Sequence, residues 1–153
     1  MKFIVLIVLF VTIILLQFFQ PEKNRSGIDS NHIFMSGDIP SDIELILAKS
    51  CLDCHSNQTN YKWYDHIAPA SWIVRKHIDE GREELNFSDW AIIDDYEKIS
   101  LLGDIADEVV KKRMPLKSYT MIHMDAKVND EEIERITAWA EQYSNEIFQE
   151  IRK

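Results

Sequence analysis

The chain begins with a long apolar run, and shorter segments follow in which apolar residues recur every three or four positions. Phe3 to Phe19 is interrupted only by Thr12 and Gln17. At about 1.5 Å per residue, a helix over this run covers roughly 25 Å, close to the hydrocarbon core of a bilayer at about 30 Å. Residues 1–20 are therefore predicted to form a transmembrane signal-anchor helix.

The flanks of this run bear on its orientation and cleavage. Lys2 and the amino terminus give it a positive start, which favours a cytoplasmic N-terminus and export of the remainder. The small residues of a signal-peptidase site are missing after Phe19. An uncleaved single-pass anchor in a bacterial inner membrane is therefore favoured over a cleaved signal peptide, and either alternative places the rest of the chain in the periplasm.

Residues 21–40 have little periodicity and contain Pro, Gly, Ser and Asn, a composition that predicts a tether. The helical pattern belongs to residues 41–153, the predicted domain. Ser41 and Glu44 have the spacing of a capping box, which opens a helix that runs to about Cys51.

Further helices follow in this domain. Pro69 can begin a helix from Ala70 to about Glu84, and Ser88 is a candidate N-cap for a third helical region with a bend at Gly103. In the last helix, buried positions are expected at intervals of three and four, at Ile133, Ile136, Ala140, Tyr143 and Ile147. No segment has the alternation of a strand, so the predicted fold class is all-α.

The only two cysteines form the sequence Cys51-Leu52-Asp53-Cys54-His55. On a helix, positions i, i+3 and i+4 share one face, so both sulfurs and the imidazole can point the same way. C-x-x-C-H is the attachment signature of a c-type haem. The motif predicts one covalent haem c per chain, with thioethers at Cys51 and Cys54 and with His55 bound to the iron.

Other roles for the cysteine pair fit less well. A structural zinc site needs four ligands, and the remaining histidines are scattered singly along the chain. A thioredoxin-like redox pair needs a βαβ context, which the helical pattern does not provide. A disulfide would close a very short loop and would leave His55 without a role.

Met114 is the preferred candidate for the second axial ligand. It follows a predicted helix and precedes Pro115, so a loop can present its thioether to the iron. A Met/His pair raises the reduction potential and suits electron transfer. An open site is a further alternative. The other candidate side chains are His77, His123, His66, Met121 and Met124.

Three more residues are predicted to contact the cofactor. Tyr61 and Trp63 lie in the loop of residues 56–69 and can cover the haem or simply the core. Arg82 can pair with a haem propionate or with neighbouring acidic residues on the surface.

The charge of the chain limits its partners. The net charge is −9, and every acidic residue follows the apolar run. Such a surface makes nucleic acid a poor partner. Lys111, Lys112, Arg113 and Lys117 surround Met114 in the sequence and could form a positive docking patch for a redox partner. Alternatively, the first three only complement a helix C-terminus.

The order of these parts resembles that of a small class I cytochrome c. Six stretches carry a more specific resemblance: Cys51–Asn57, Asn60–Tyr64, Ile67–Trp72, Glu80–Ser88, Met114–Tyr119 and His123–Ala126. On these stretches, the region from about Ile39 to Glu141 is similar to the bacterial haem-binding domain family. The resemblance implies a cytochrome c-like helical fold and covalent haem c with His55 as proximal ligand, and it implies no substrate. Family members commonly have Pro near Lys62 and at the position of Met124, and Met124 here adds a possible sulfur ligand close to His123.

These observations together predict a membrane-tethered periplasmic monohaem cytochrome that transfers electrons between unidentified redox proteins. The alternative is a haem-based sensor or small-ligand binder with a weak or open sixth site. An enzyme such as a peroxidase is not expected, because peroxidases that carry c-type haem generally use two haems and the sequence has one haem motif.

Overall fold

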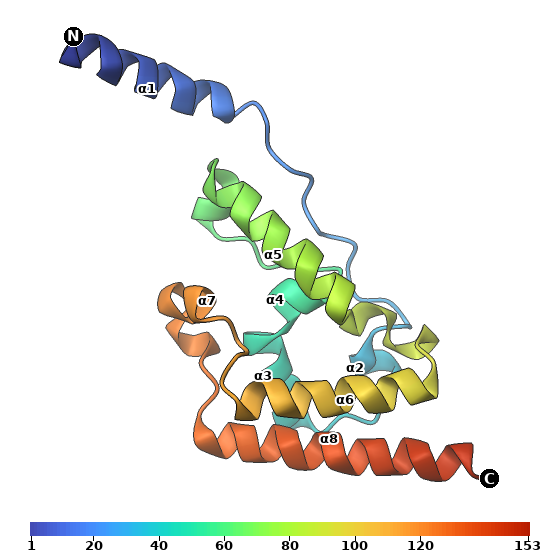
Figure 1. Cartoon of the computed structure of the whole chain (residues 1–153). Coiled ribbons are helices and arrows are strands. Elements are labelled where there is room, and N and C mark those ends of the chain that lie inside the picture. Colours follow the sequence, from blue (N-terminus) through green and yellow to red (C-terminus); the bar gives the residue numbers. More distant parts are fainter.

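A computed structural model describes all 153 residues, and its regular elements are all helical. Figure 1 shows two layers joined by short helices in the middle. The all-α prediction is therefore confirmed. The elements are α1 (Lys2–Leu16), α2 (Ile33–Ser36), α3 (Ser41–Ser50), α4 (Leu52–His55), η1 (Trp63–His66), α5 (Ala70–Glu84), η2 (Phe87–Ile92), α6 (Asp95–Val110), α7 (Lys117–Ile122), η3 (Met124–Ala126) and α8 (Asp130–Ile151).

The first layer is the hydrophobic core, in which α6 and α8 lie side by side and α3 packs on α8 (Figure 1). Of the five positions of α8 predicted to be buried, Ile136, Ala140 and Ile147 are buried, with Trp139 beside them, whereas Ile133 and Tyr143 are half-buried against the core. Helix α8 opens with a capping box between Asn129 and Glu132. The remaining core residues come from α2, α3, η2 and α6, together with Ile39.

The second layer contains α5, which packs against α4 and η1. Its bounds are those predicted, with Pro69 at the N-cap. Gly81 is needed where α5 meets α4, because a Cβ there would lie 2.9 Å from the carbonyl oxygen of Cys54. The two layers meet at α4, which carries the second cysteine of the C-x-x-C-H motif.

Several predicted helix boundaries are wrong. Pro40, not Ser41, is the N-cap of α3, and no side chain caps it. Asn86 caps η2, and Ser88 lies within that helix because the Asn86 side chain accepts the Ser88 amide. Helix α6 begins only after Asp94 and has no break at Gly103.

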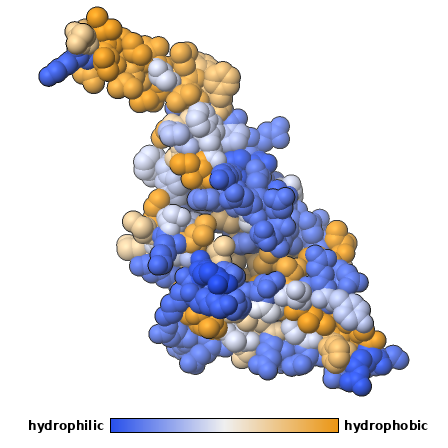
Figure 2. Space-filling view, viewed as in Figure 1, coloured by the Kyte–Doolittle hydropathy of each residue, from blue (hydrophilic) through white to orange (hydrophobic).

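The predicted transmembrane helix over residues 1–20 is not found. Helix α1 ends at Leu16, and its 15 residues cover about 22 Å at the α-helical rise. The Gln17 side chain hydrogen-bonds both the amide and the carbonyl of Ala68, at 2.9 and 3.2 Å, so the helix ends where the chain meets the domain. No helix of the protein combines the length and the apolarity needed to cross a membrane. All large apolar residues of α1 except Leu16 are exposed. Figure 2 shows the face of this helix that is turned to the viewer as almost entirely hydrophobic.

Residues 21–40, predicted to be a tether, lie along the domain and are held there by hydrogen bonds. The backbone of Asn24 and Ser26 pairs with that of Thr59 and Asn57, at 3.1 and 2.8 Å. The Asn24 side chain is buried and donates to the Ser56 carbonyl at 2.7 Å. Further along, His32, Ile33 and Ile39 are buried. This segment, which we call the strap, forms part of the folded unit.

Candidate functional site

The cysteine motif lies at the junction of α3 and α4. Cys51 interrupts the helix, with φ −121° and ψ −45°, so the motif occupies a break and a short helix rather than the end of one continuous helix. The amides of Cys54 and His55 both bond the Cys51 carbonyl, at 3.2 and 3.0 Å. This single turn keeps both cysteines and the histidine on one side.

Two neighbouring cavities, of about 230 and 440 Å³, border the motif. Cys51, His55 and Met114 line both of them, and Cys54 lines the smaller. The larger is walled mainly by apolar residues of α6 and η2 and by Leu85. The structure therefore brings together the four residues predicted to hold a haem, although Met114 lies 59 residues beyond His55.

The imidazole of His55 is held in the orientation that a metal ligand needs. Its Nδ1 lies 3.0 Å from the carbonyl oxygen of Leu85, so Nδ1 carries the proton and donates it to this oxygen. Nε2 then keeps its lone pair free for a metal. Burial lowers the pKa of His55, an effect that hydrogen bonds to the Leu85 and Gly81 carbonyls oppose. The neutral form, which is the ligating form, is thus favoured.

Cys51 and Cys54 do not form a disulfide with each other. Burial, and secondarily the other cysteine, raises the pKa of Cys51 to about 12, and burial with nearby Asp53 and Asp65 raises that of Cys54 to about 11. Redox-active C-x-x-C pairs have lowered pKa values, because the thiolate is the reactive form. This environment therefore does not favour a thiol–disulfide centre.

The side chains also do not form a zinc site. No group of three or more His, Cys, Asp or Glu residues converges as a set of metal ligands, whereas a structural zinc site needs four. His55 instead stands beside a mainly apolar cavity with a thioether on the same wall. This donor set fits a haem, which supplies four ligands of its own and needs only axial ones from the protein.

Residues 11–142 match the haem-binding domain family. The chain belongs to the haem-binding domain family. Haem is therefore its cofactor. The match includes the strap as well as the helices that follow. No curated protein and no solved structure matches this chain.

Three residues predicted to contact the haem line neither cavity. The Tyr61 hydroxyl accepts a hydrogen bond from the backbone N–H of Asn24 at 2.8 Å, so Tyr61 helps to fix the strap. Trp63 is 76% exposed and has its edge against Tyr64. Arg82 is half-buried on α5 with no acceptor for its Nε.

Of the other candidate axial ligands, only two lie at either cavity. His77 and His123 line the smaller cavity, and neither lines the larger. His66, Met121 and Met124 are exposed and line neither. Met114 is thus the one methionine at the cavities, and it shares both with His55.

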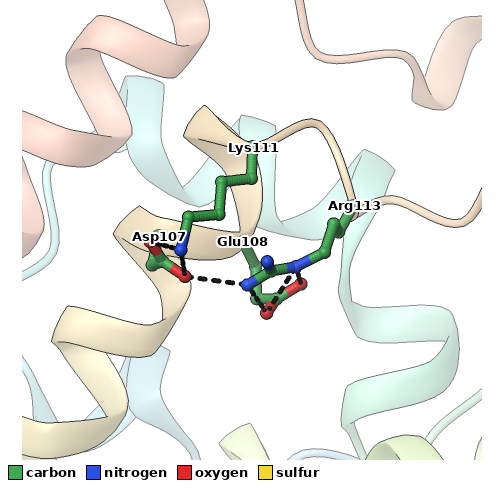
Figure 3. Close-up of polar contacts among 4 residues, drawn as sticks. All are labelled: Asp107, Glu108, Lys111 and Arg113. Atoms are coloured by element: carbon green, nitrogen blue, oxygen red, sulfur yellow. Dashed lines mark hydrogen bonds and ion pairs between the residues drawn. The ribbon is translucent and has the colours of Figure 1, made fainter.

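The predicted positive docking patch beside Met114 is largely neutralised. Arg113 donates from Nε to both carboxylate oxygens of Glu108, at 3.0 Å, and from Nη2 to Asp107 at 2.8 Å (Figure 3). Lys111 pairs with Asp107, and Lys112 reaches Asp130 at 2.7 Å. The basic residues at the end of α6 therefore have partners within the domain.

Polar side chains whose contacts with one another the sequence does not predict gather at the smaller cavity. They are Asp53, Tyr64 and Tyr119, together with His123, which was considered only as an iron ligand. The Tyr119 hydroxyl donates to Asp53 Oδ2 at 2.7 Å, and the Tyr119 ring stacks on His123 with centroids 4.2 Å apart. His123 Nε2 is hydrogen-bonded to the Tyr64 hydroxyl. Their wide separation in sequence hid this cluster.

Proposed function

We propose that this member of the haem-binding domain family is a c-type cytochrome that carries electrons through a single covalently attached haem. The observation that most directly supports this proposal is that both cysteines, His55 and Met114 border one cavity. One C-x-x-C-H motif corresponds to one haem per chain. The protein is proposed as a carrier and not as an enzyme, because the chain shows no acid–base or nucleophilic motif.

The two cysteines would hold the haem by thioethers. Each thiol adds across one vinyl group, so that sulfur binds one carbon and the thiol hydrogen goes to the other.

His55 and Met114 would be the axial ligands. The Leu85 carbonyl holds the imidazole, and the loop after α6 holds Met114, whose amide donates to the Glu108 carbonyl at 3.2 Å. A bound haem iron supplies the one-electron chemistry, and a His/Met pair raises its potential. Filling both positions from the protein leaves the iron to exchange electrons rather than substrates.

The proposed location is outside the cytoplasm, in the periplasm of a bacterium. The support is the apolar N-terminal segment, exposed along α1, which suits a role in export. The proposed partners are redox proteins. Since the basic residues near Met114 are paired with acidic ones, association with them should depend only weakly on ionic strength.

A second candidate function is a haem-based sensor that binds a small ligand at the iron. His77, His123, Tyr64 and Tyr119 line the smaller cavity and offer hydrogen bonds to such a ligand. This function requires that Met114 leave the iron, or never bind it.

Visible spectra of the haem-loaded full chain test the proposal. We expect low-spin spectra in both oxidation states, the weak far-red band of methionine-ligated ferric haem, and no binding of carbon monoxide. Met114→Leu should abolish the far-red band and allow carbon monoxide to bind. Met121→Leu, in an exposed methionine that borders neither cavity, is the matched control and should change nothing.

Covalent attachment is tested by mass spectrometry of the same chain. A mass increase of one haem that survives denaturation is expected, and it should be lost in Cys51→Ala with Cys54→Ala. A wild-type protein that is high-spin and binds carbon monoxide would favour the sensor, and a chain without covalent haem would overturn the c-type assignment.

A further inference from the structure

Helix α7 follows the Met114 loop directly, and burial does little to hold it in place. None of its six residues is buried, and Met121 and Ile122 are 79% and 65% exposed. Among the other elements it packs substantially only with η3, which is itself a single turn. A helix without a buried face needs other contacts to fix its position.

Those contacts are polar and lie on one face of the turn. Tyr119 and His123 stand four residues apart, so they project from the same side. The Tyr119 hydroxyl donates to Asp53 Oδ2 at 2.7 Å, and His123 Nε2 bonds the Tyr64 hydroxyl. The stacking of the Tyr119 ring on His123, with an interplanar angle of 15°, joins the two contacts into one unit.

The acceptor of Tyr119 is fixed from the other side. Asp53 lies between the two cysteines, its Oδ1 accepts the Asn60 amide at 2.9 Å, and its backbone carbonyl accepts the Thr59 hydroxyl at 2.7 Å. Thr59 is buried, so its hydrogen bond to the Asp53 carbonyl is shielded from water. The hydrogen bond from Tyr119 therefore connects the loop that carries Met114 to the segment that carries His55.

We propose that Tyr119 and Asp53 are positioning residues that latch α7 onto the C-x-x-C-H motif and so hold the Met114 sulfur at the haem iron. This inference rests on the proposed ligand role of Met114. When this latch opens, the segment after Pro115 keeps two attachments: the bonds of the Met114 and Arg113 amides to the Glu108 carbonyl at the end of α6, and the single hydrogen bond between His123 and Tyr64. The sixth coordination site would then open while both thioethers and His55 stay in place.

The first test compares haem-loaded Tyr119→Phe with the wild type. We expect unchanged covalent haem, a weaker far-red methionine band, and binding of carbon monoxide to the reduced variant but not to the reduced wild type. Tyr96→Phe removes the same hydroxyl from an exposed tyrosine of α6 and should match the wild type. Equal spectra and equal carbon monoxide binding for Tyr119→Phe and the wild type would overturn the latch.

Changes at the acceptor identify the interaction itself. Asp53→Ala should reproduce the Tyr119→Phe spectrum, and Asp53→Asn, which keeps an acceptor oxygen, should restore most of the methionine band. The double variant Tyr119→Phe/Asp53→Ala should be no worse than either single variant, because both remove one contact. Additive effects would show that the two residues act separately, which contradicts the proposal.

Hydrogen exchange of the haem-free full chain separates the latch from the ligand assignment. Tyr119→Phe should speed amide exchange in residues 116–123 and leave α8 unchanged, whatever binds the iron. If the wild type lacks the methionine band but this exchange increases, the Met114 assignment fails and the attachment of α7 by Tyr119 stands. If the band is present and exchange does not change, the latch fails alone.

Discussion

Helices α8 and α7 both lie near the C-terminal end of the chain, yet they are held in opposite ways. Helix α8 buries Ile136, Trp139, Ala140 and Ile147 against the core, whereas α7 buries nothing and depends on hydrogen bonds from Tyr119 and His123. Burial of an apolar side chain contributes about 1.5–3 kcal/mol, while a hydrogen bond contributes about 1 kcal/mol. The first layer, which is the hydrophobic core, should therefore be far more stable than α7 and the second layer.

The same contrast separates the two layers as a whole. The large buried cluster includes residues of α2, α3, η2, α6 and α8, and none of α4, α5 or α7. In the second layer, α5 buries only Ser71 and Ile78. We infer that the core forms without the cofactor and that haem binding completes the packing of α4, α5 and α7. Four predictions test this comparison.

The largest effect is expected for Trp90, which is 1% exposed and stands between Phe87 and Tyr143 in the core. Trp90→Ala should lower the free energy of unfolding by about 3–5 kcal/mol, the usual cost of such a cavity. Trp63→Ala makes the same change in a side chain that is 76% exposed, and it should cost far less. Urea denaturation of the haem-free chain measures both, and equal losses would contradict the two-layer description.

A smaller loss is expected for Gly81, where α5 touches α4. Gly81→Ala places a methyl group 2.9 Å from the Cys54 carbonyl oxygen and should destabilise the protein by about 1–3 kcal/mol. Gly103→Ala in α6 meets no atom within 4 Å and should stabilise it by about 0.5–1 kcal/mol. Thermal unfolding of the two variants should move in opposite directions, and a Gly81→Ala variant as stable as wild type would show that the two helices can separate freely.

The contact between α3 and the start of α8 should make stability depend on pH. Burial raises the pKa of Glu132, but hydrogen bonds from Lys49 Nζ, at 2.6 Å, and from the Asn129 amide outweigh it, so the pKa is lowered. A carboxylate with a lowered folded-state pKa stabilises the protein above its unfolded pKa of about 4.5 and loses this contribution as the pH falls through the folded value.

Glu132→Gln should therefore lower the free energy of unfolding by about 1 kcal/mol at pH 7, and by progressively less below a pH of about 4.5. Urea midpoints measured from pH 7 to pH 3 give this difference. Glu131→Gln, in the exposed neighbour, is the control. A loss for Glu132→Gln that stays constant over this range would exclude the ionic contribution.

The smallest effect is expected at the end of α6. The ion pairs of Arg113 with Glu108 and Asp107 are exposed, and such pairs contribute little to stability. Arg113→Gln should leave the unfolding midpoint unchanged within error. It should also change the rate of electron transfer from small anionic reductants only slightly, because the charge of Arg113 is already compensated. A large fall in that rate that varies with salt concentration would show that Arg113 does belong to a positive docking patch.

The sequence determined the parts of the molecule that depend on local pattern. The spacing in α8 identified its buried face, Pro69 and the following residues gave the bounds of α5, and C-x-x-C-H together with Met114 identified four residues of the cavity. Each of these follows from helical periodicity or from chemistry contained in a short segment.

Only the tertiary structure determined the contacts between distant segments. The strap has no apolar period, and it is held by hydrogen bonds to residues 56–59 and to Tyr61. Tyr119 and Asp53 are 66 residues apart, and although Asp53 stands inside C-x-x-C-H, it occupies one of the two positions that this motif leaves variable. A hydrogen bond between two single polar side chains leaves no periodic pattern in the sequence. The residues around Tyr119 and Asp53 do not distinguish them from a Tyr or an Asp that is simply exposed to solvent. The way α7 and the strap are attached is therefore visible only once the chain has folded.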